Sequence, residues 1–221
     1  MNRNFPERLL AALSVMELAS QLFGLCGARA KPSNGGLIVR QLIARLGGLS
    51  GARVFKIPGV RRLIKTHGPS ANFTKRTALQ LIGKADPNNS SASFKNHEDL
   101  FIESRPVNTK LTPEMAFSYL VEKGLFRMGA ELICPACNLP SWIALDQLQQ
   151  QNICDLCGGR YDGTRQLVNG EFRYRRTGVL GLEKNAQGAV AVALVLQQLS
   201  TSIRSFGHDE IYIPLGCGPD N

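Results

Sequence analysis

The chain has 221 residues, of which 43% are hydrophobic, and its mean hydropathy of −0.09 is typical of a folded, soluble protein rather than a disordered one. Its longest apolar run falls far short of the roughly 18 residues that cross a bilayer, which excludes a membrane span and a membrane partner. Six cysteines are too few for a small disulfide scaffold. The formal net charge of +9 and the pI of about 9.5 favour polyanionic partners.

The positive charge is concentrated in the N-terminal part of the chain. No acidic residue lies between Glu17 and Asp86, although this stretch carries twelve of the 26 lysines and arginines. The other parts of the sequence hold 14 basic and all 17 acidic residues. Because lysine and arginine bind phosphates without sequence-specific geometry, this bias predicts a nucleic-acid partner, with DNA favoured. A solvated basic surface and an acidic protein partner are the alternative interpretations.

The first predicted element is a helix over residues 5–25, with apolar side chains on two of its faces. Such a helix is expected either to contact two neighbours or to bend near Glu17. A signal peptide is not expected, because Glu17 follows an apolar run of only about eight residues and no small-residue cleavage site lies at the right distance. Cys26 stands among large apolar residues and is predicted to belong to the core.

Several short elements with basic outer faces follow. Residues 37–46 predict a helix with one broad apolar face, 51–57 a short extended piece, 58–68 a short helix, and 73–84 a helix capped by Thr74. Short helices with small linkers and basic outer faces are consistent with a helix-turn-helix-like module.

Four segments are predicted, and the fold class that they indicate is α+β. After the basic helical region 1–85, residues 86–110 are polar and rich in small side chains, which indicates a linker. Residues 111–178 begin with a helix marked by a threonine cap, a first-turn proline and a first-turn acid, and they contain two CxxC pairs. In the C-terminal element 179–221, the apolar stretch 188–204 fits a helix or a buried strand, and its length favours a helix.

The strongest motif in the sequence is the pair Cys134/Cys137 followed by Cys154/Cys157, with sixteen residues between the pairs. Two CxxC pairs at this spacing are typical of a zinc site with four thiolate ligands. A residue that tolerates positive φ is needed just after each pair, and a glycine and an asparagine stand there. A redox pair and two disulfides are the competing interpretations, and the paired motifs favour zinc and a reducing, cytoplasmic setting.

Strand-like residues surround both pairs, and residues 128–162 therefore resemble a zinc ribbon, in which two hairpin turns hold one ion. Four thiolates fill the coordination sphere, so we expect one structural Zn²⁺ and no activated water. Trp142 lies inside this segment, where packing is the favoured role and base stacking the alternative.

Interleaved aromatic and basic residues form the sequence FRYRR just after the ribbon. In a strand, Phe172, Tyr174 and Arg176 share one face, while Arg173 and Arg175 share the other. This pattern suits base stacking with phosphate contacts, and it equally suits an ordinary edge strand. The candidate nucleic-acid contacts are the basic residues of the short helices and of this strand: Arg53, Lys56, Arg61, Arg62, Lys65, Lys75, Arg76, Arg173, Arg175 and Arg176.

The stretches FKIPGVRRLI, LICPACNLPSWIALDQL, CDLCGGRYD, FRYRRTGVLG and QGAVAVALVLQQL together resemble the N-terminal region of uncharacterised bacterial proteins in which a ribbon precedes a restriction-endonuclease-like domain. The resemblance covers most of residues 35–200 and implies a role in DNA handling or defence, with the chemistry downstream. Such a nuclease needs an acid-x-Lys pair. The last segment offers Asp209 and Glu210 without that pair, so nuclease activity is not expected here, and 179–221 fits the truncated start of a further domain.

No complete catalytic constellation is found in the sequence. His67, His97 and His208 are far apart and lie in polar stretches, and no phosphate-binding glycine loop is present. No small-molecule substrate is indicated. The leading hypothesis is therefore a non-catalytic, zinc-binding and nucleic-acid-binding protein. The alternatives are an adaptor that docks another protein through the ribbon and the apolar element, and a truncated remnant of a larger nuclease.

Overall fold

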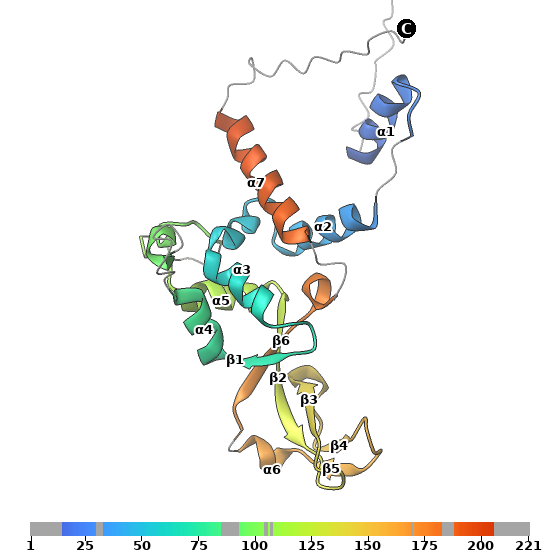
Figure 1. The fold of residues 1–221 in the computed structure, drawn as a ribbon, viewed down its shortest axis with the longest axis vertical. Helices are drawn as coiled ribbons and strands as arrows, with labels where there is room; N and C mark the ends of the chain where they lie inside the picture. The colour runs from blue at the N-terminus through green and yellow to red at the C-terminus, as the bar shows by residue number, and fades with distance from the viewer. Residues whose placement is uncertain are drawn as a thin grey trace, which may run out of the picture.

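The computed structural model describes residues 15–29, 33–84, 93–103, 106, 108–168, 170–182 and 188–205. The described part of the chain is an α+β protein, as predicted, with a body of helices at one end and a smaller unit built around the two CxxC pairs at the other (Figure 1). The helices are α1 (Val15–Leu25), α2 (Asn34–Arg45), α3 (Pro58–Thr66), α4 (Lys75–Gly83), α5 (Pro113–Glu122), α6 (Thr164–Leu167) and α7 (Ala189–Ser205). Short 3-10 helices are η1 (Gly51–Lys56), η3 (Phe94–His97), η4 (Leu145–Gln147) and η5 (Gly178–Gly181).

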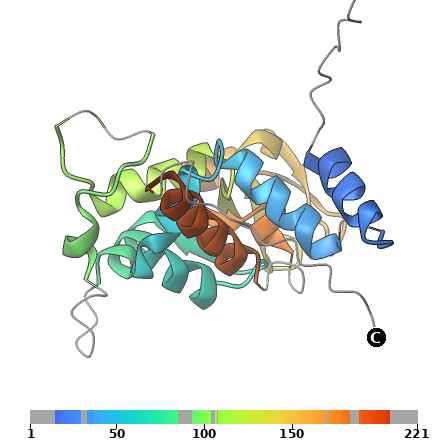
Figure 2. The ribbon, with the colours of Figure 1, turned by 90° about the horizontal axis from the view of Figure 1, so that it is seen from above.

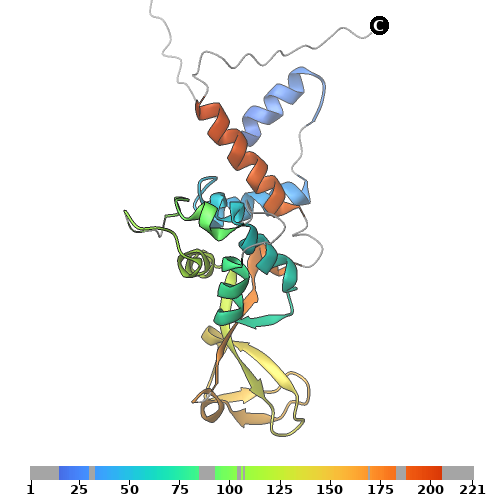
Figure 3. The same cartoon turned by 60° about the vertical axis from the view of Figure 1, so that its left-hand side comes forward.

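Two antiparallel sheets carry the strands. The strands are β1 (Asn72–Thr74), β2 (Phe126–Ile133), β3 (Pro140–Ala144), β4 (Gln151–Ile153), β5 (Arg160–Asp162) and β6 (Phe172–Arg176). The four-stranded sheet has the order β1-β6-β2-β3, and β4 pairs with β5 in a sheet of two strands. Met128 on β2 lies opposite Tyr174 on β6, and Glu131 lies opposite Trp142 on β3. β2 and β6 therefore run from the helical body into the unit that holds the cysteines (Figure 3).

The main core lies in the helical body and is rich in aromatic side chains. Phe73, Phe117, Phe126 and Tyr174 pack against one another, and the Phe73 and Phe126 ring centroids are 5.3 Å apart in an edge-on arrangement. The tyrosine at position 119 is fully buried and donates its hydroxyl to the carbonyl of Leu46, 3.0 Å away. These contacts join α5 to α2, β1, β2 and β6, so segments far apart in the sequence close one core.

α7 packs along α2 and η1 with one of its faces (Figure 2). Ala189, Ala193 and Gln197 recur every four residues and are buried, which is the periodicity of a helix with one covered face. The helical prediction for 188–204 is therefore confirmed over Ala189–Ser205.

Two predicted helix starts are confirmed in atomic detail. The Thr74 hydroxyl accepts the N–H of Thr77 at 3.2 Å and begins α4. The Thr112 hydroxyl accepts the N–H of Met115 at 3.2 Å, and Pro113 occupies the first turn of α5. Both caps satisfy an amide that has no partner within its own helix.

Two predictions about the N-terminal half are wrong. Residues 51–57 are not extended: Gly51–Lys56 form the 3-10 helix η1, because four of its six residues are buried and tertiary packing overrides the β-branched, aromatic local pattern. Cys26 is exposed rather than in the core, and large apolar residues of α1 are exposed with it. The predicted start of this first helix, residues 5–14, lies outside the described residues.

Within residues 86–110, for which a linker is predicted, Phe94 and Ile102 are buried in the main core. Leu111 donates its N–H to the carbonyl of Glu98 at 2.7 Å. This stretch thus contributes packing to the body in addition to connecting α4 with α5. Among the described residues, no helix is both long and apolar enough to span a membrane.

Candidate metal centre

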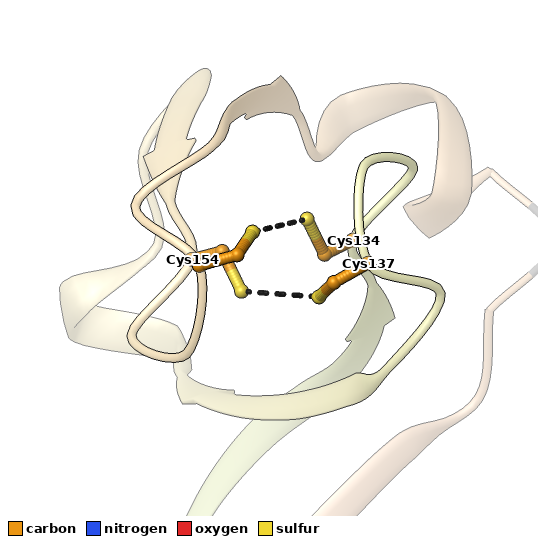
Figure 4. Close-up of side chains that lie close together, drawn as sticks. Cys134, Cys137 and Cys154 are labelled. Atoms are coloured by element: carbon orange, nitrogen blue, oxygen red, sulfur yellow. Dashed lines mark hydrogen bonds between the residues drawn. The ribbon is translucent and has the colours of Figure 1, made fainter.

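The four cysteines lie on two hairpin turns that face each other. Cys134 and Cys137 follow the end of β2, and Cys154 and Cys157 follow the end of β4 (Figure 4). A small core supports them, formed by Ala130, Leu132 and Tyr161 with the buried Cys134 and Cys154. Each pair thus ends a strand, and the pairing of β2 with β3 and of β4 with β5 fixes where each turn points.

The distances between the sulfurs fit a tetrahedral metal site. The Sγ atoms of Cys134 and Cys157 are 3.6 Å apart, those of Cys137 and Cys154 are 3.7 Å apart, and all four lie within 4.8 Å of one another. Around an ion with metal–sulfur bonds of about 2.3 Å, the sulfurs of a tetrahedron lie about 3.8 Å apart. A disulfide would need about 2.05 Å, and all four cysteines are free. The predicted clustering of the four cysteines is confirmed.

The two turns have the same backbone pattern. The N–H of Asn138 donates to the Cys134 carbonyl at 2.8 Å, and the N–H of Gly158 donates to the Cys154 carbonyl at 2.8 Å. The φ angles at these two positions are +58° and +70°, as the sequence predicts. A side chain at Gly159 would meet the Cβ of Ala136 on the first turn at 3.2 Å, so its glycine lets the two turns approach each other.

Backbone amides and neighbouring sulfurs shift the pKa of Cys154 in the same direction and that of Cys137 in opposite directions. N–H groups of Cys157 and Leu156 donate to the Cys154 sulfur and lower the pKa of this thiol to about 7. The Leu139 N–H favours the Cys137 thiolate, but burial and the other three sulfurs raise the pKa of Cys137 to about 12. Four adjacent sulfurs cannot all be negative without a cation among them, so a metal ion would displace the protons that they share.

Two polar side chains that the sequence analysis missed hold the site in shape. Gln166 on α6 accepts the N–H of Ile133 and donates to the carbonyl of Ile133, both at 2.8 Å, as a neighbouring strand would. The buried Asn152 donates to the carbonyl of Gln149 at 2.7 Å and accepts its N–H at 3.3 Å. No local sequence signal marks either residue, because glutamine and asparagine are common in exposed loops and only the fold brings these partners together.

The predicted nucleic-acid contacts on the helices are partly used within the protein. Lys56 donates to Gln198 on α7 at 3.2 Å, Arg61 donates to the carbonyl of Lys56 at 2.9 Å, and Arg62 donates to the carbonyl of Lys84 at 3.4 Å. A hydrogen bond to a neutral amide or carbonyl oxygen leaves the positive charge in place. The bonds of Lys56 and Arg61 thus fix the geometry of these two side chains without neutralising their charge.

The three arginines of β6 are engaged with the body and with the ribbon. Arg173 donates to Asn72 at 3.2 Å and lies 3.8 Å from Glu131. Arg176 donates to the carbonyl of Ile64 at 2.9 Å.

Arg175 covers the Trp142 ring at 4.6 Å from its centroid. The predicted packing role of Trp142 is thus supported by a cation–π contact across the sheet.

Four predicted contacts remain. Lys75 is paired with Glu114, whereas Arg53, Lys65 and Arg76 are not in an ion pair with a described residue. Lys65 on α3 and Arg76 on α4 are exposed, and neither makes a side-chain hydrogen bond or ion pair with another described residue. Arg53 is half-buried beside α7 and also has no such partner. No described residue therefore occupies the polar groups of these three side chains.

No family model, curated protein or solved structure matches this chain. The resemblance to ribbon proteins with a nuclease domain is therefore without support from a relative. What the chain does must be inferred from its own geometry.

Proposed function

We propose that the four cysteines bind one Zn²⁺ as a structural ion and that this ion fixes the fold of the ribbon, residues 128–162. The observation that carries the proposal is the sulfur geometry, with two separations of 3.6 and 3.7 Å. A complete set of thiolate ligands selects a soft or borderline ion and leaves no position for a reacting water. The role of the metal is then to fold the chain.

Elemental analysis of the purified protein tests this directly. We expect one zinc per chain in the parent and none in Cys154→Ser, because an alcohol does not replace a thiolate at such a site. Cys26→Ser is the matched control: it makes the same chemical change at an exposed cysteine outside the cluster, and it should keep the metal. Iron in place of zinc would reject the zinc assignment while leaving the ligand set intact.

We further propose that the helical body binds nucleic acid, most favourably DNA, through its acid-free basic segment. Its support is the charge that the fold leaves in place: Arg61 of α3 is bonded to neutral carbonyls, and Lys65 and Arg76 are exposed with no hydrogen bond or ion pair to a described residue. Such a surface binds phosphates with an affinity that falls as the salt concentration rises.

The topology gives a second line of support. β1 lies between α3 and α4, α5 follows, and β6 pairs between β1 and β2. This order of three helices and three strands resembles a helix-turn-helix with a β-hairpin wing, in which the ribbon would extend the hairpin. α5 would then stand in the place of the recognition helix. Its acidic Glu114 and Glu122 argue for backbone contacts from α3 and α4 rather than base reading by α5.

Anisotropy titrations of labelled duplex DNA and RNA at several salt concentrations test this proposal. The double variant Lys65→Gln/Arg76→Gln should weaken binding and lower the salt slope by about 1 for each phosphate that is no longer neutralised. Lys95→Gln is the matched control, since Lys95 is also exposed but lies outside the acid-free segment. Binding that ignores salt, or a double variant that binds like Lys95→Gln, would refute it.

A second candidate function is docking of another protein, and one observation favours it. Val192, Val195, Leu196 and Leu199 recur at three- and four-residue spacing on α7, and all four are exposed. An apolar stripe of this kind is typical of a helix that packs against a partner. Light scattering of the purified chain, compared with Val195→Glu, tests whether the partner is a second copy: a dimer that the variant abolishes would support it.

A further inference from the structure

Two apolar helices at the same end of the molecule are open to solvent. α1 and α7 both lie at the end opposite the ribbon, and α2 lies between them when the molecule is seen from above (Figures 1 and 2). Residues 20–25 of α1 are all exposed, and a Cβ placed on Gly24 would meet no atom within 4 Å. The described side chains of α1 therefore have no apolar cover.

The exposed residues of α1 are apolar. Leu22 is 46% exposed, Phe23 53% and Leu25 85%, and the helix has a single charged residue, Glu17. Isolated helices shorter than about 12–15 residues are marginal in water, and α1 has 11 residues. Burial of its apolar side chains would supply the missing free energy. α1 thus needs a partner surface to stay helical.

α7 presents a surface of the same kind. Beside the face that packs on α2 and η1, it exposes the apolar stripe Val192, Val195, Leu196 and Leu199. The single charged residue of α7 is Arg204, near its C-terminal end. Because the stripe itself holds no cation that could bind a phosphate, it suits an apolar protein surface rather than nucleic acid.

The apolar positions of the two helices match when the helices run antiparallel. Apolar residues recur at spacings of three and four in both, at positions 18, 22 and 25 of α1 and 192, 195 and 199 of α7. This is the spacing of helices that pack along their length. In an antiparallel pair, Leu22 faces Val195, and one matched apolar pair lies on either side of it.

Charge favours the antiparallel direction over the parallel one. A parallel pair would match the apolar positions equally well, because Val15 continues the spacing in α1. In the antiparallel register, however, Glu17 comes opposite Ser200, about one turn from Arg204. In the parallel register it comes opposite Leu194, about 15 Å from Arg204 along the helix axis. Only the antiparallel pair brings the acidic residue of α1 towards the basic residue of α7.

A second copy of the chain brings both surfaces together. A different protein docked on α7 would leave α1 uncovered, whereas a two-fold dimer places each α1 on the α7 of the other copy. Burial of the exposed apolar side chains in two such contacts would remove on the order of 1,200 Å² from water, the lower limit of a stable interface.

The connection between α1 and α2 disfavours closure within one chain. α1 ends in a tight turn, in which the N–H of Ala28 donates to the Phe23 carbonyl at 2.9 Å and Gly27 has φ +70°. Only residues 29–33 then separate this turn from α2. This leaves little chain to carry α1 back over α2 onto its own α7.

We propose that two copies of the chain associate through these helices, with α1 of each copy packed antiparallel on the apolar stripe of its partner's α7. The inference rests on the docking function proposed for α7, and it names the element that meets the stripe. The contact uses neither α3 nor α4, so the DNA binding proposed for those helices does not depend on it.

Light scattering of the full chain at several concentrations tests the proposal. We expect a dimer with a Kd below about 10 µM. Leu22→Glu and Val195→Glu should each raise this Kd at least about tenfold, because each buries an unpaired charge in the contact. Ser20→Glu is the matched control: Ser20 is exposed on the opposite side of α1 from Leu22, and its variant should dimerise like the parent.

Disulfide trapping identifies which copy supplies α1. A Leu22→Cys chain and a Val195→Cys chain of different mass, both with Cys26→Ser, are mixed and oxidised. We expect a disulfide between positions 22 and 195 that links the two chains, located by mass spectrometry of the peptides. A Ser20→Cys chain mixed with the same Val195→Cys chain is the control and should cross-link at least about tenfold less.

A parent that stays monomeric at about 100 µM would overturn the proposal and would leave α7 to dock a different protein. A dimer that is lost in Val195→Glu but kept in Leu22→Glu would also overturn it, since α7 would then dock without α1. A disulfide that forms only within a single chain carrying both new cysteines would show that α1 covers its own α7, which overturns the proposal as well.

Discussion

The helical body and the ribbon are stabilised in different ways, although they share a strand. The body closes over a core of interlocking aromatic rings, with Phe117 and Tyr174 centroids 4.9 Å apart. The hydrophobic core of the ribbon has five buried residues, and two of these are the cysteines at positions 134 and 154. A unit of this size cannot bury enough apolar surface to fold without a cross-link or a metal. The comparison indicates that packing supports the body, and the proposed ion would take over that role in the ribbon.

β2 is the strand that belongs to both regions. Phe126 at its start is in the main core, whereas Leu132 near its end is in the ribbon core. Between them, a side chain at Gly129 would come within 2.3 Å of the Ile143 carbonyl oxygen, so β3 approaches β2 very closely there. The position of the ribbon relative to the body is thus set by one continuous strand.

The largest expected effect comes from removing a metal ligand. Cys134→Ser should release the ion and unfold residues 128–162, since ion binding at such sites contributes about 10–16 kcal/mol. The body should remain folded, because its interlocking rings, Phe117 and Phe126 among them, pack within the main core. Hydrogen exchange, read segment by segment, measures both outcomes. Loss of protection in α4 and α5 along with the ribbon would show that the two regions fold as one unit.

The converse substitution tests the independence of the ribbon. Phe117→Ala removes a buried ring from the body and should lower its free energy of unfolding by about 3–5 kcal/mol. This ring belongs to the main core and the sulfur cluster to the ribbon core, so the zinc content should stay at that of the parent. Urea unfolding followed by circular dichroism gives the first quantity and elemental analysis the second. Metal loss in parallel with unfolding of the body would contradict the comparison.

A smaller effect is expected at the first turn of the ribbon. Asn138 has φ +58°, and alanine in this left-handed conformation costs about 1–2 kcal/mol. Asn138→Ala should therefore lower the affinity for zinc about tenfold or somewhat more, measured by competition with a chelator. Asn138→Gly is the matched control, because glycine adopts this φ without strain and should keep the parental affinity.

The smallest effect is a pH dependence confined to the body. Burial, with a further contribution from Arg176, lowers the pKa of His67, which lies 4.6 Å from the Phe73 ring. The unfolded chain takes up a proton near the ordinary pKa of about 6.5, whereas the folded chain resists it. Stability contributed by neutral His67 is thus present above this pH and is lost as the pH falls.

His67→Phe should flatten the decline in melting temperature between pH 7 and pH 5 relative to the parent. The difference between the two curves isolates this group from the carboxylates, which titrate in both proteins. Curves that stay parallel would show that His67 does not titrate with unfolding.

Some features were predictable because they depend on neighbouring residues alone. The caps Thr74 and Thr112 are recognised from the residue types that follow them, and both are present. The positive φ at Asn138 follows from its place after a CxxC pair. By contrast, η1 was mispredicted as extended and Cys26 as buried, since local composition does not show which faces a distant helix will cover.

By itself, the sequence determined the two cysteine pairs of the cluster, the ends of several helices and the segregation of charge, because each depends on spacing or composition over a few residues. The tertiary structure alone decided which cations have no hydrogen-bond or ion-pair partner among the described residues. It placed Arg53 and the buried Gln197 beside one cavity, although they are far apart along the chain. It also brought two pairs of thiols within 4.8 Å of one another. Long-range packing sets such juxtapositions, and no local pattern encodes them.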